Sequence, residues 1–280
     1  MLTPSAQLLN SFVRPKSMKT LATLITMMVL TLPVSARAQN NEMRADIDKD
    51  IPLAEAIRRA NKQFPDVQPL TEQEVIAAVP EGIPVILDAK RGDIASTAEA
   101  YAKSAFEQLG AHAITLSPYL GKDSIDPFLT YKEKGVFLLC KTSNPSAADL
   151  QDLTIDHRPL SMAGEPSSVV HRPLSMPLYE HIAYLAQQWD TGNNIGLVVA
   201  ATQPEALKRV RSAAPDLWLL VPGVGAQGGD LETVLRSGLR TDGKGLLINV
   251  SRGISRAENP AQAAAEIRDT IINIQYSMKH

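Results

Sequence analysis

Two acidic and two basic side chains occur in Asp88-Ala89-Lys90-Arg91-Gly92-Asp93-Ile94, which directly follows the apolar run Ile83-Pro84-Val85-Ile86-Leu87. The run predicts a buried strand, and residues two apart in a strand point the same way, so Asp88 and Lys90 should project together. Gly92 is expected to let the chain turn and present Asp93. Buried charges are costly unless they pair, so this cluster favours a catalytic strand end over a packing role. The alternative is a solvated turn after an edge strand.

Apolar runs alternate with helical patterns from residue 83 onward. Strands are expected at Ile83–Leu87, Ala113–Leu116, Gly135–Cys140, Ile195–Ala200, Trp218–Val221 and Gly245–Val250. Helices are expected at Thr97–Leu109, Ser124–Lys132, Leu178–Trp189, Pro204–Ala213, Asp230–Ser237 and Pro260–Ile274. Short strands separated by helices indicate a parallel sheet with right-handed crossovers. The polar motifs follow the strands at their carboxyl ends, where (β/α)8 barrels carry their active sites.

The composition agrees with a globular enzyme domain. A single domain of 280 residues is common for an α/β barrel. The net charge of −2, from 28 basic and 30 acidic residues, gives no electrostatic footprint for nucleic acid or an acidic membrane. Recognition of phosphate is therefore expected to be local. The single cysteine, Cys140, is expected to be a buried core thiol, because no His-bearing motif is evident to activate it.

A glycine-rich turn spans Pro222–Gly229 and contains four glycines. It is expected to expose backbone N–H groups just before a helix, while the forked guanidinium of Arg252, after the next strand, can bind an anion. Loops after the seventh and eighth strands of barrels commonly bind phosphate. The two features predict a phosphate site, and the alternative is that the glycines only make a tight turn.

Five motifs, in order along the chain, resemble those of orotidine 5'-phosphate decarboxylases. They are Asp88–Ile94 continued by Ser96-Thr97-Ala98 and Tyr101-Ala102, Ser117–Gly121 with Asp123-Ser124, Cys140–Pro145, Pro222–Gly229 and Asn249–Gly253. The resemblance covers about residues 73–280. It implies a TIM-type (β/α)8 barrel that lacks the family's usual first two β/α units.

The resemblance also implies an activity, which is decarboxylation of orotidine 5'-phosphate to UMP, the last step of de novo pyrimidine biosynthesis. It implies catalysis without metal or organic cofactor, and a homodimer with shared active sites. Association with an orotate phosphoribosyltransferase, which is fused to the enzyme in some relatives, is a further partner that it suggests. A cytoplasmic location is expected from the pathway.

In this resemblance Lys90 is the catalytic cation and proton donor for the carbanion that develops on the pyrimidine. Asp88 would hold Lys90 charged and oriented and would crowd the substrate carboxylate, and Asp93 would be contributed by the partner subunit.

The resemblance assigns further side chains to substrate binding. They are Thr97, Ser143, Pro222, Gln227, Gly228 and Arg252. Gln227 and Arg252 would contact the phosphate and Ser143 the pyrimidine ring. Thr97 would reach across the dimer interface.

Residues 1–72 depart from the family. The family's first strand carries a Gly-Leu-Asp-Pro-like turn and its second strand a lysine, and neither pattern is found here. Lys62 is the nearest lysine, but no apolar strand precedes it. The site is therefore incomplete at the sequence level.

Residues 1–38 are expected to be a signal-like or non-native segment. Basic residues precede the apolar run Leu21–Val34, and Ala36-Arg37-Ala38 has the small-x-small form of a cleavage site. These features indicate export or membrane association through residues 18–38 as the alternative to a cytoplasmic location. Met18 is an alternative start of the chain. Residues 39–72 are expected to form a polar linker or short helical segment, and residues 73–280 the barrel domain.

A tandem repeat interrupts the resemblance. His157-Arg158-Pro159-Leu160-Ser161-Met162 returns as His171-Arg172-Pro173-Leu174-Ser175-Met176. Its Pro, Ser and Gly content predicts an exposed loop. The paired histidines invite a metal site, but no Cys or acidic cluster stands at ligand spacing, so none is predicted.

Two other functions stay open. A related keto-sugar-phosphate decarboxylase shares the Asp88, Lys90 and Asp93 core but uses a metal, and the Gly225–Gly229 and Ser143 motifs speak against it. A non-catalytic, phosphate-ligand-binding remnant of the same fold is favoured by the missing second-strand lysine.

Overall fold

The computed structural model describes residues 72–156, 175–225 and 227–277. The segment expected at 1–38, nearly all of that expected at 39–72, and Lys62 lie outside these residues. The same holds for most of the tandem repeat, because residues 157–174 are not among those described.

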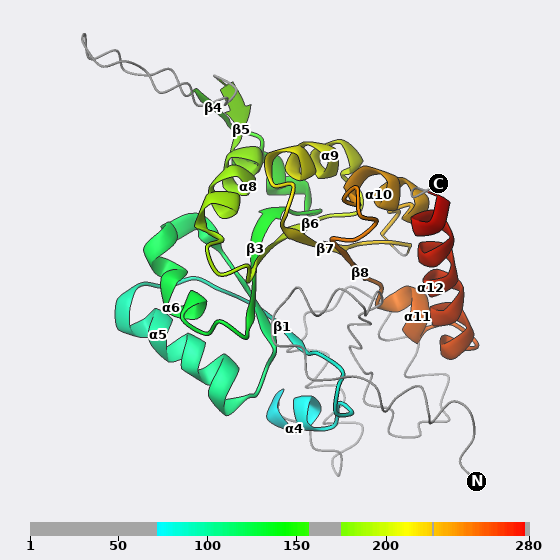
Figure 1. Ribbon diagram of the computed structural model, residues 1–280, viewed down its shortest axis with the longest axis horizontal. Coiled ribbons are helices and arrows are strands. Elements are labelled where there is room, and N and C mark those ends of the chain that lie inside the picture. Colours follow the sequence, from blue (N-terminus) through cyan, green and yellow to red (C-terminus); the bar gives the residue numbers. More distant parts are fainter. Residues whose placement is uncertain (1–71, 157–174, 226, 278–280) are drawn as a thin grey trace.

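A curved, parallel sheet forms the centre of the fold (Figure 1). Its strands run in the order β1 (Ile86–Arg91), β2 (Ala113–Leu116), β3 (Gly135–Lys141), β6 (Ile195–Val199), β7 (Trp218–Pro222) and β8 (Leu246–Asn249). Every neighbouring pair is parallel, as the alternation of strands and helices predicted. In the described part of the chain β1 and β8 lie at the two ends of the sheet and do not pair, so the barrel is open there.

Helices surround the outer face of the sheet (Figure 1). The helices of the described residues are α4 (Glu72–Ala77), α5 (Ala95–Lys103), α6 (Asp126–Leu129), α7 (Ala148–Gln151), α8 (Leu178–Trp189), α9 (Pro204–Ala213), α10 (Leu231–Gly238), α11 (Arg252–Ser255) and α12 (Pro260–Ser277). A separate antiparallel ribbon joins β4 (Thr154–Asp156) to β5 (Ser175–Pro177). Among the described residues, no helix is both long and apolar enough to cross a bilayer.

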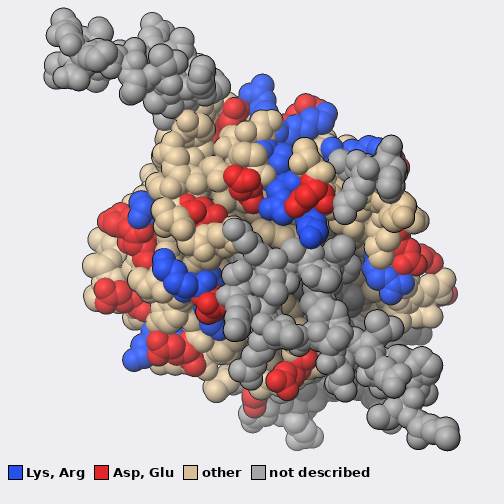
Figure 2. Space-filling model, viewed as in Figure 1, with Lys and Arg blue, Asp and Glu red and all other residues tan. Residues whose placement is uncertain are grey.

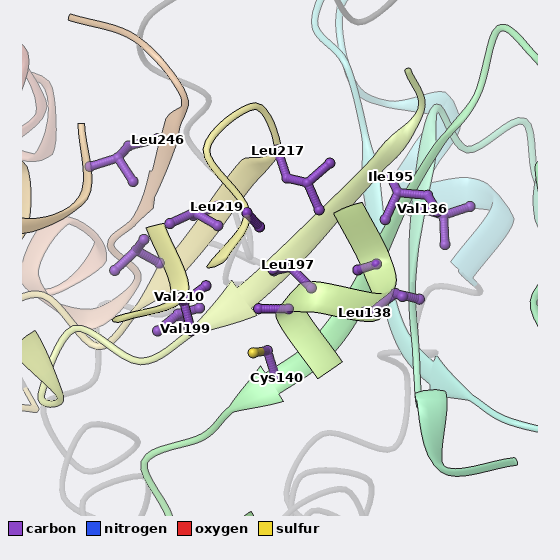
Figure 3. Close-up of a cluster of buried hydrophobic side chains, with 14 of the residues drawn as sticks. Val136, Leu138, Cys140, Ile195, Leu197, Val199, Val210, Leu217, Leu219 and Leu246 are labelled. Atoms are coloured by element: carbon purple, nitrogen blue, oxygen red, sulfur yellow. The ribbon is translucent and has the colours of Figure 1, made fainter. Parts of the chain in front are cut away.

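Alternate residues of each strand pack into two hydrophobic clusters. Leu138, Leu197 and Leu219 are fully buried between the sheet and the helices (Figure 3). The intervening Phe137 and Val198 belong to a second, smaller cluster on the other face. Strands of a parallel sheet are covered on both faces, which explains why their sequences are apolar throughout rather than alternating with polar residues.

Cys140 lies in the larger cluster, where its thiol donates to the carbonyl of Tyr179 over 3.1 Å (Figure 3). It is 1% exposed, and burial raises the pKa of the thiol well above its usual value. The thiol therefore stays protonated at neutral pH. Because only the thiolate is a good nucleophile, Cys140 is expected to be unreactive. The prediction of a buried core thiol is confirmed.

A buried arginine ties the amino-terminal ends of the last two strands to the helices. The guanidinium of Arg211, on α9, donates to the carbonyls of Ala214, Pro215, Leu217, Gly238 and Gly245. Burial lowers its pKa to about 10, so it remains a cation at neutral pH. One charged side chain thereby satisfies carbonyls that would be costly to bury unpaired.

Several predicted elements coincide with the observed ones residue for residue, including Ala113–Leu116, Leu178–Trp189 and Pro204–Ala213. The first strand was misplaced, because β1 begins at Ile86 and includes Asp88 and Lys90 rather than ending before them. The register with β2 extends to Arg91 across an irregularity, and this keeps the charged residues within the strand.

Two predicted helices differ from the observed ones. Thr97–Leu109 is instead α5 followed by a π-helical turn at Ser104–Gln108. Ser124–Lys132 contracts to α6, because a 3-10 turn at Lys122–Ser124 precedes it and Ser124 donates its hydroxyl proton to the Gly121 carbonyl. Side chains of Ser compete with helical backbone bonds in this way.

Gly196 is required by close packing between β3, β6 and β7. A Cβ at this position would lie 2.5 Å from Cε1 of Phe137 and 2.7 Å from the Trp218 carbonyl oxygen. Gly196→Ala should therefore lower the free energy of unfolding by roughly 1–3 kcal/mol, measured by urea denaturation. The exposed Glu99→Ala on α5 is the control, with an expected change below about 0.5 kcal/mol. An unchanged midpoint for Gly196→Ala would contradict this packing.

Candidate active site

Asp88 and Lys90 form an ion pair at the carboxyl end of β1. Lys90 Nζ lies 2.6 Å from Asp88 Oδ2, so the prediction that the two side chains project together is confirmed. The side chain of Lys90 is 53% exposed and that of Asp88 58% exposed. The charges are therefore solvated rather than buried, unlike the expectation from the sequence, and water screening leaves such a pair little effect on stability.

Thr115 holds both members of this pair. It lies on β2 and is 1% exposed. Its hydroxyl donates to Asp88 Oδ1 over 2.8 Å and accepts the Lys90 backbone N–H over 3.0 Å. The sequence analysis missed Thr115, although a lone hydroxyl in the apolar strand Ala113-Ile114-Thr115-Leu116 was an available signal.

The backbone is irregular at this point. Lys90 has φ 48° and Ala95 has φ 49°, both in the left-handed region that residues with a side chain seldom occupy. Such a conformation costs on the order of 1–2 kcal/mol per residue and persists only where the surroundings enforce it. The charged strand end is therefore held in a conformation that its own residues do not prefer.

Gly92 does not make the turn that the sequence predicted, because its φ is not positive. Its small size serves a different purpose. A Cβ on Gly92 would lie 3.2 Å from the Cβ of Ser117, in the loop after β2. The glycine allows close approach of the two loops, and the Ser117 N–H donates to the Arg91 carbonyl over 2.7 Å.

Asp93 and Thr97 follow the ion pair in the chain, in the loop after β1 and on α5. Asp93 is half-buried and accepts the N–H of Ile94 through Oδ1 over 2.8 Å, and Thr97 is exposed on α5. Large apolar side chains are exposed in the same loops, where Ile94 is 53% and Tyr119 79% exposed. This part of the rim combines polar residues of the motif with uncovered apolar area.

Ser143 is exposed in the loop after β3. Its neighbours in the chain are held by a hydrogen bond and an ion pair. The Thr142 N–H donates to Gln151 Oε1 over 2.9 Å. The buried Lys141 pairs with Asp152 over 2.5 Å and lies 5.4 Å from the ring centroid of Tyr179. A buried ammonium needs such a partner, and here the pair fastens the loop that presents Ser143.

Pro222, Gln227 and Arg252 line one hollow of about 90 Å³ at the carboxyl ends of β7 and β8. The other lining residues are Gly223, Val224, Asn249 and Ser251. Of these, Asn249 and Ser251 are polar groups that the sequence analysis did not assign to the site. The hollow is small and has a polar rim, which suits an anion held by a guanidinium and an amide.

The glycine turn differs from the prediction in one respect. The N–H groups of Gly225, Gly228 and Gly229 donate to carbonyls within the turn, those of Gly229, Gly225 and Gly223, respectively. The sequence analysis expected these N–H groups to be available to a ligand. They are instead used within the turn. Gly228 is also not among the residues that line the hollow.

A larger hollow, of about 490 Å³, lies at the opposite end of the sheet. It is lined by Gln187, Asp190, Asn193, Asp216, Trp218, Arg240, Asp242 and Lys244. These residues begin or precede β6, β7 and β8, and active sites of barrels do not form at that end. Acidic and basic side chains also interleave on the face that Figure 2 shows, without a broad patch of one sign.

The fold and the rim together define a (β/α) barrel with a charged strand end and an anion-sized hollow. The chain belongs to the orotidine 5'-phosphate decarboxylase / HUMPS family, whose model matches residues 62–267. The family match begins at residue 62, whereas the resemblance seen in the sequence motifs began at about residue 73.

Individual relatives agree with this family. The chain is 53% identical over 187 residues to an orotidine 5'-phosphate decarboxylase of Verminephrobacter eiseniae, covering 66% of this chain and 63% of the relative. It is 46% identical over 221 residues to that of Dechloromonas aromatica, covering 78% and 72%. The chain thus spans less than two thirds of the length of the first of these relatives.

Solved structures agree on the fold. The OMP decarboxylase of Leishmania donovani superposes with a TM-score of 0.63 at 51% identity, covering 73% of each chain. The UMP synthase of the same organism gives a TM-score of 0.64 at 54% identity, covering 73% of this chain and 42% of that one.

Proposed function

We propose that this protein decarboxylates orotidine 5'-phosphate to UMP. The observation that carries the proposal is the Lys90–Asp88 ion pair at the same rim of the sheet as the hollow beside Arg252. The relatives described above are orotidine 5'-phosphate decarboxylases, which favours this reaction over that of a sugar-phosphate decarboxylase.

Loss of carbon dioxide leaves an electron pair on the pyrimidine carbon, and this carbanion needs a nearby cation. The Lys90 ammonium supplies that charge and then the proton that replaces the carboxylate. Asp88 orients the Lys90 ammonium through the 2.6 Å ion pair.

Substrate binding uses the remaining residues of the rim. Arg252 and Gln227 hold the phosphate in the hollow above Pro222, with Gly228 keeping the turn in shape, and Ser143 contacts the pyrimidine. Binding energy from the distant phosphate then orients the reacting end, so that contacts far from the bond being broken contribute to the rate.

The active form is a homodimer with shared sites. Asp93 and Thr97 reach the partner's site, and the exposed Ile94, Tyr119 and Leu120 in the loops after β1 and β2 provide apolar area for the contact. The barrel domain spans residues 73–280 and acts in the cytoplasm, where the pathway operates.

Orotidine 5'-phosphate should lose its ultraviolet absorbance band when incubated with the protein, and Lys90→Ala should abolish this turnover while the protein stays folded. The physical reason is loss of both the cation and the proton source. Lys208→Ala is the matched control, because Lys208 is also exposed and paired, with Glu205 over 2.8 Å. A Lys90→Ala enzyme with wild-type rate would refute the assigned role. Binding of UMP without any wild-type turnover would instead identify a non-catalytic remnant.

Arg252→Ala should reduce kcat/KM by roughly 10- to 100-fold, the loss expected for a hydrogen bond between charged groups. Orotidine without its phosphate should be processed equally by the variant and the parent, because the missing contact is to phosphate. Arg236→Ala, which removes an exposed arginine paired with Glu232 on α10, is the control. Equal losses with both substrates would place Arg252 outside the phosphate site.

Shared sites predict that two inactive variants complement each other. Lys90→Ala and Asp93→Ala protomers, co-expressed in equal amounts, should regain about one quarter of the wild-type activity, because half of the dimers are mixed and each has one intact site. Differently tagged protomers allow the mixed dimer to be isolated and assayed. Mixed dimers without activity would show that each site is built within one chain.

A further inference from the structure

The hydroxyl of Thr115 contacts both residues of the ion pair. It donates to Asp88 Oδ1 over 2.8 Å and accepts the Lys90 N–H over 3.0 Å. Asp88 Oδ2 stays available to the Lys90 ammonium, 2.6 Å away. One side chain of β2 thereby contacts the carboxylate of Asp88 and the backbone of Lys90 at once.

These bonds have a fixed direction. A hydroxyl has one proton to donate, and in this arrangement its oxygen already accepts the Lys90 N–H. The proton of Thr115 is donated to Asp88 Oδ1, so the hydroxyl uses its donor and an acceptor site at once. Burial adds to the effect, since Thr115 is 1% exposed and water does not compete for the hydroxyl.

The register of β1 and β2 is interrupted at the same place. Leu87 pairs with Ile114 and Arg91 with Leu116, so three residues of β1 face the single Thr115 between them. Lys90 lies in this interruption with φ 48°, in the left-handed region. The Thr115 oxygen accepts its N–H where the regular ladder is broken, which holds Lys90 in a conformation it would otherwise leave.

We infer that Thr115 is a positioning residue, which locks the backbone of Lys90 and the carboxylate of Asp88 so that the ammonium is presented to the substrate. The catalytic part of this inference rests on the proposed function. Thr115 does not touch the substrate and acts through Asp88 and Lys90 only. Its effect should therefore fall on kcat rather than on KM.

Thr115→Val tests the inference, because valine keeps the shape of threonine and removes the hydroxyl. We expect kcat for orotidine 5'-phosphate to fall by about 10- to 100-fold with KM changed by less than about threefold. Thr115→Ser, which restores the hydroxyl, should recover most of the lost kcat. Thr130→Val is the control, since Thr130 is exposed and donates to the Pro127 carbonyl.

A second readout does not depend on activity. The Lys90 amide proton should exchange with solvent deuterium roughly tenfold faster in Thr115→Val than in the parent or in Thr115→Ser, measured by NMR. If Thr115→Val does not fold, Thr115→Ala is tested in its place. The same fall in kcat and the same faster exchange of the Lys90 amide are expected.

The outcomes separate the inference from the proposed function. Wild-type kcat in the folded valine variant, or a serine variant as slow as the valine variant, would overturn the positioning role. A parent protein without turnover would overturn the proposed function and, with it, the catalytic part of this role. In that case the exchange rate of the Lys90 amide alone tests whether Thr115 holds the Lys90 backbone. An exchange rate unchanged in Thr115→Val would overturn that role.

Discussion

Parallel pairing of the strands determines where the polar groups of the site lie. Because neighbouring strands run the same way, all their carboxyl ends meet at one edge of the sheet. Asp88 and Lys90 from β1, Thr115 from β2, Ser143 after β3 and Arg252 after β8 reach that edge from segments far apart in the sequence. Burial of both faces of the sheet fixes the register and thereby the position of each polar group.

The two ends of the sheet differ in packing and in exposure of charge. At the amino-terminal end, the buried guanidinium of Arg211 satisfies five carbonyls and joins helices to strands. At the carboxyl end, Lys90 is held with a positive φ and its ion pair is exposed. Backbone strain is unfavourable for folding and an exposed ion pair contributes little to stability, so the well-packed end and the core between sheet and helices must offset the strain.

Much of the fold was predictable because apolar runs and helical periods are local features of sequence. The strand Ala113–Leu116 and the helices Leu178–Trp189 and Pro204–Ala213 coincide with the observed β2, α8 and α9. Features set by contact between distant segments were not predictable. Gly92 is needed for approach to Ser117 rather than for a turn, and the N–H groups of the glycine turn are used within the turn itself.

The family, the alternation of strands and helices, and the pairing of Asp88 with Lys90 could be inferred from the sequence, since all three depend on residue types and short spacings. The tertiary structure alone decided the role of Thr115, the conformation of Lys90, and the gathering of Asn249 and Ser251 with Arg252 around one hollow. The reason is that hydrogen bonds between neighbouring strands depend on register, and the register is fixed by packing of the whole sheet rather than by any one segment.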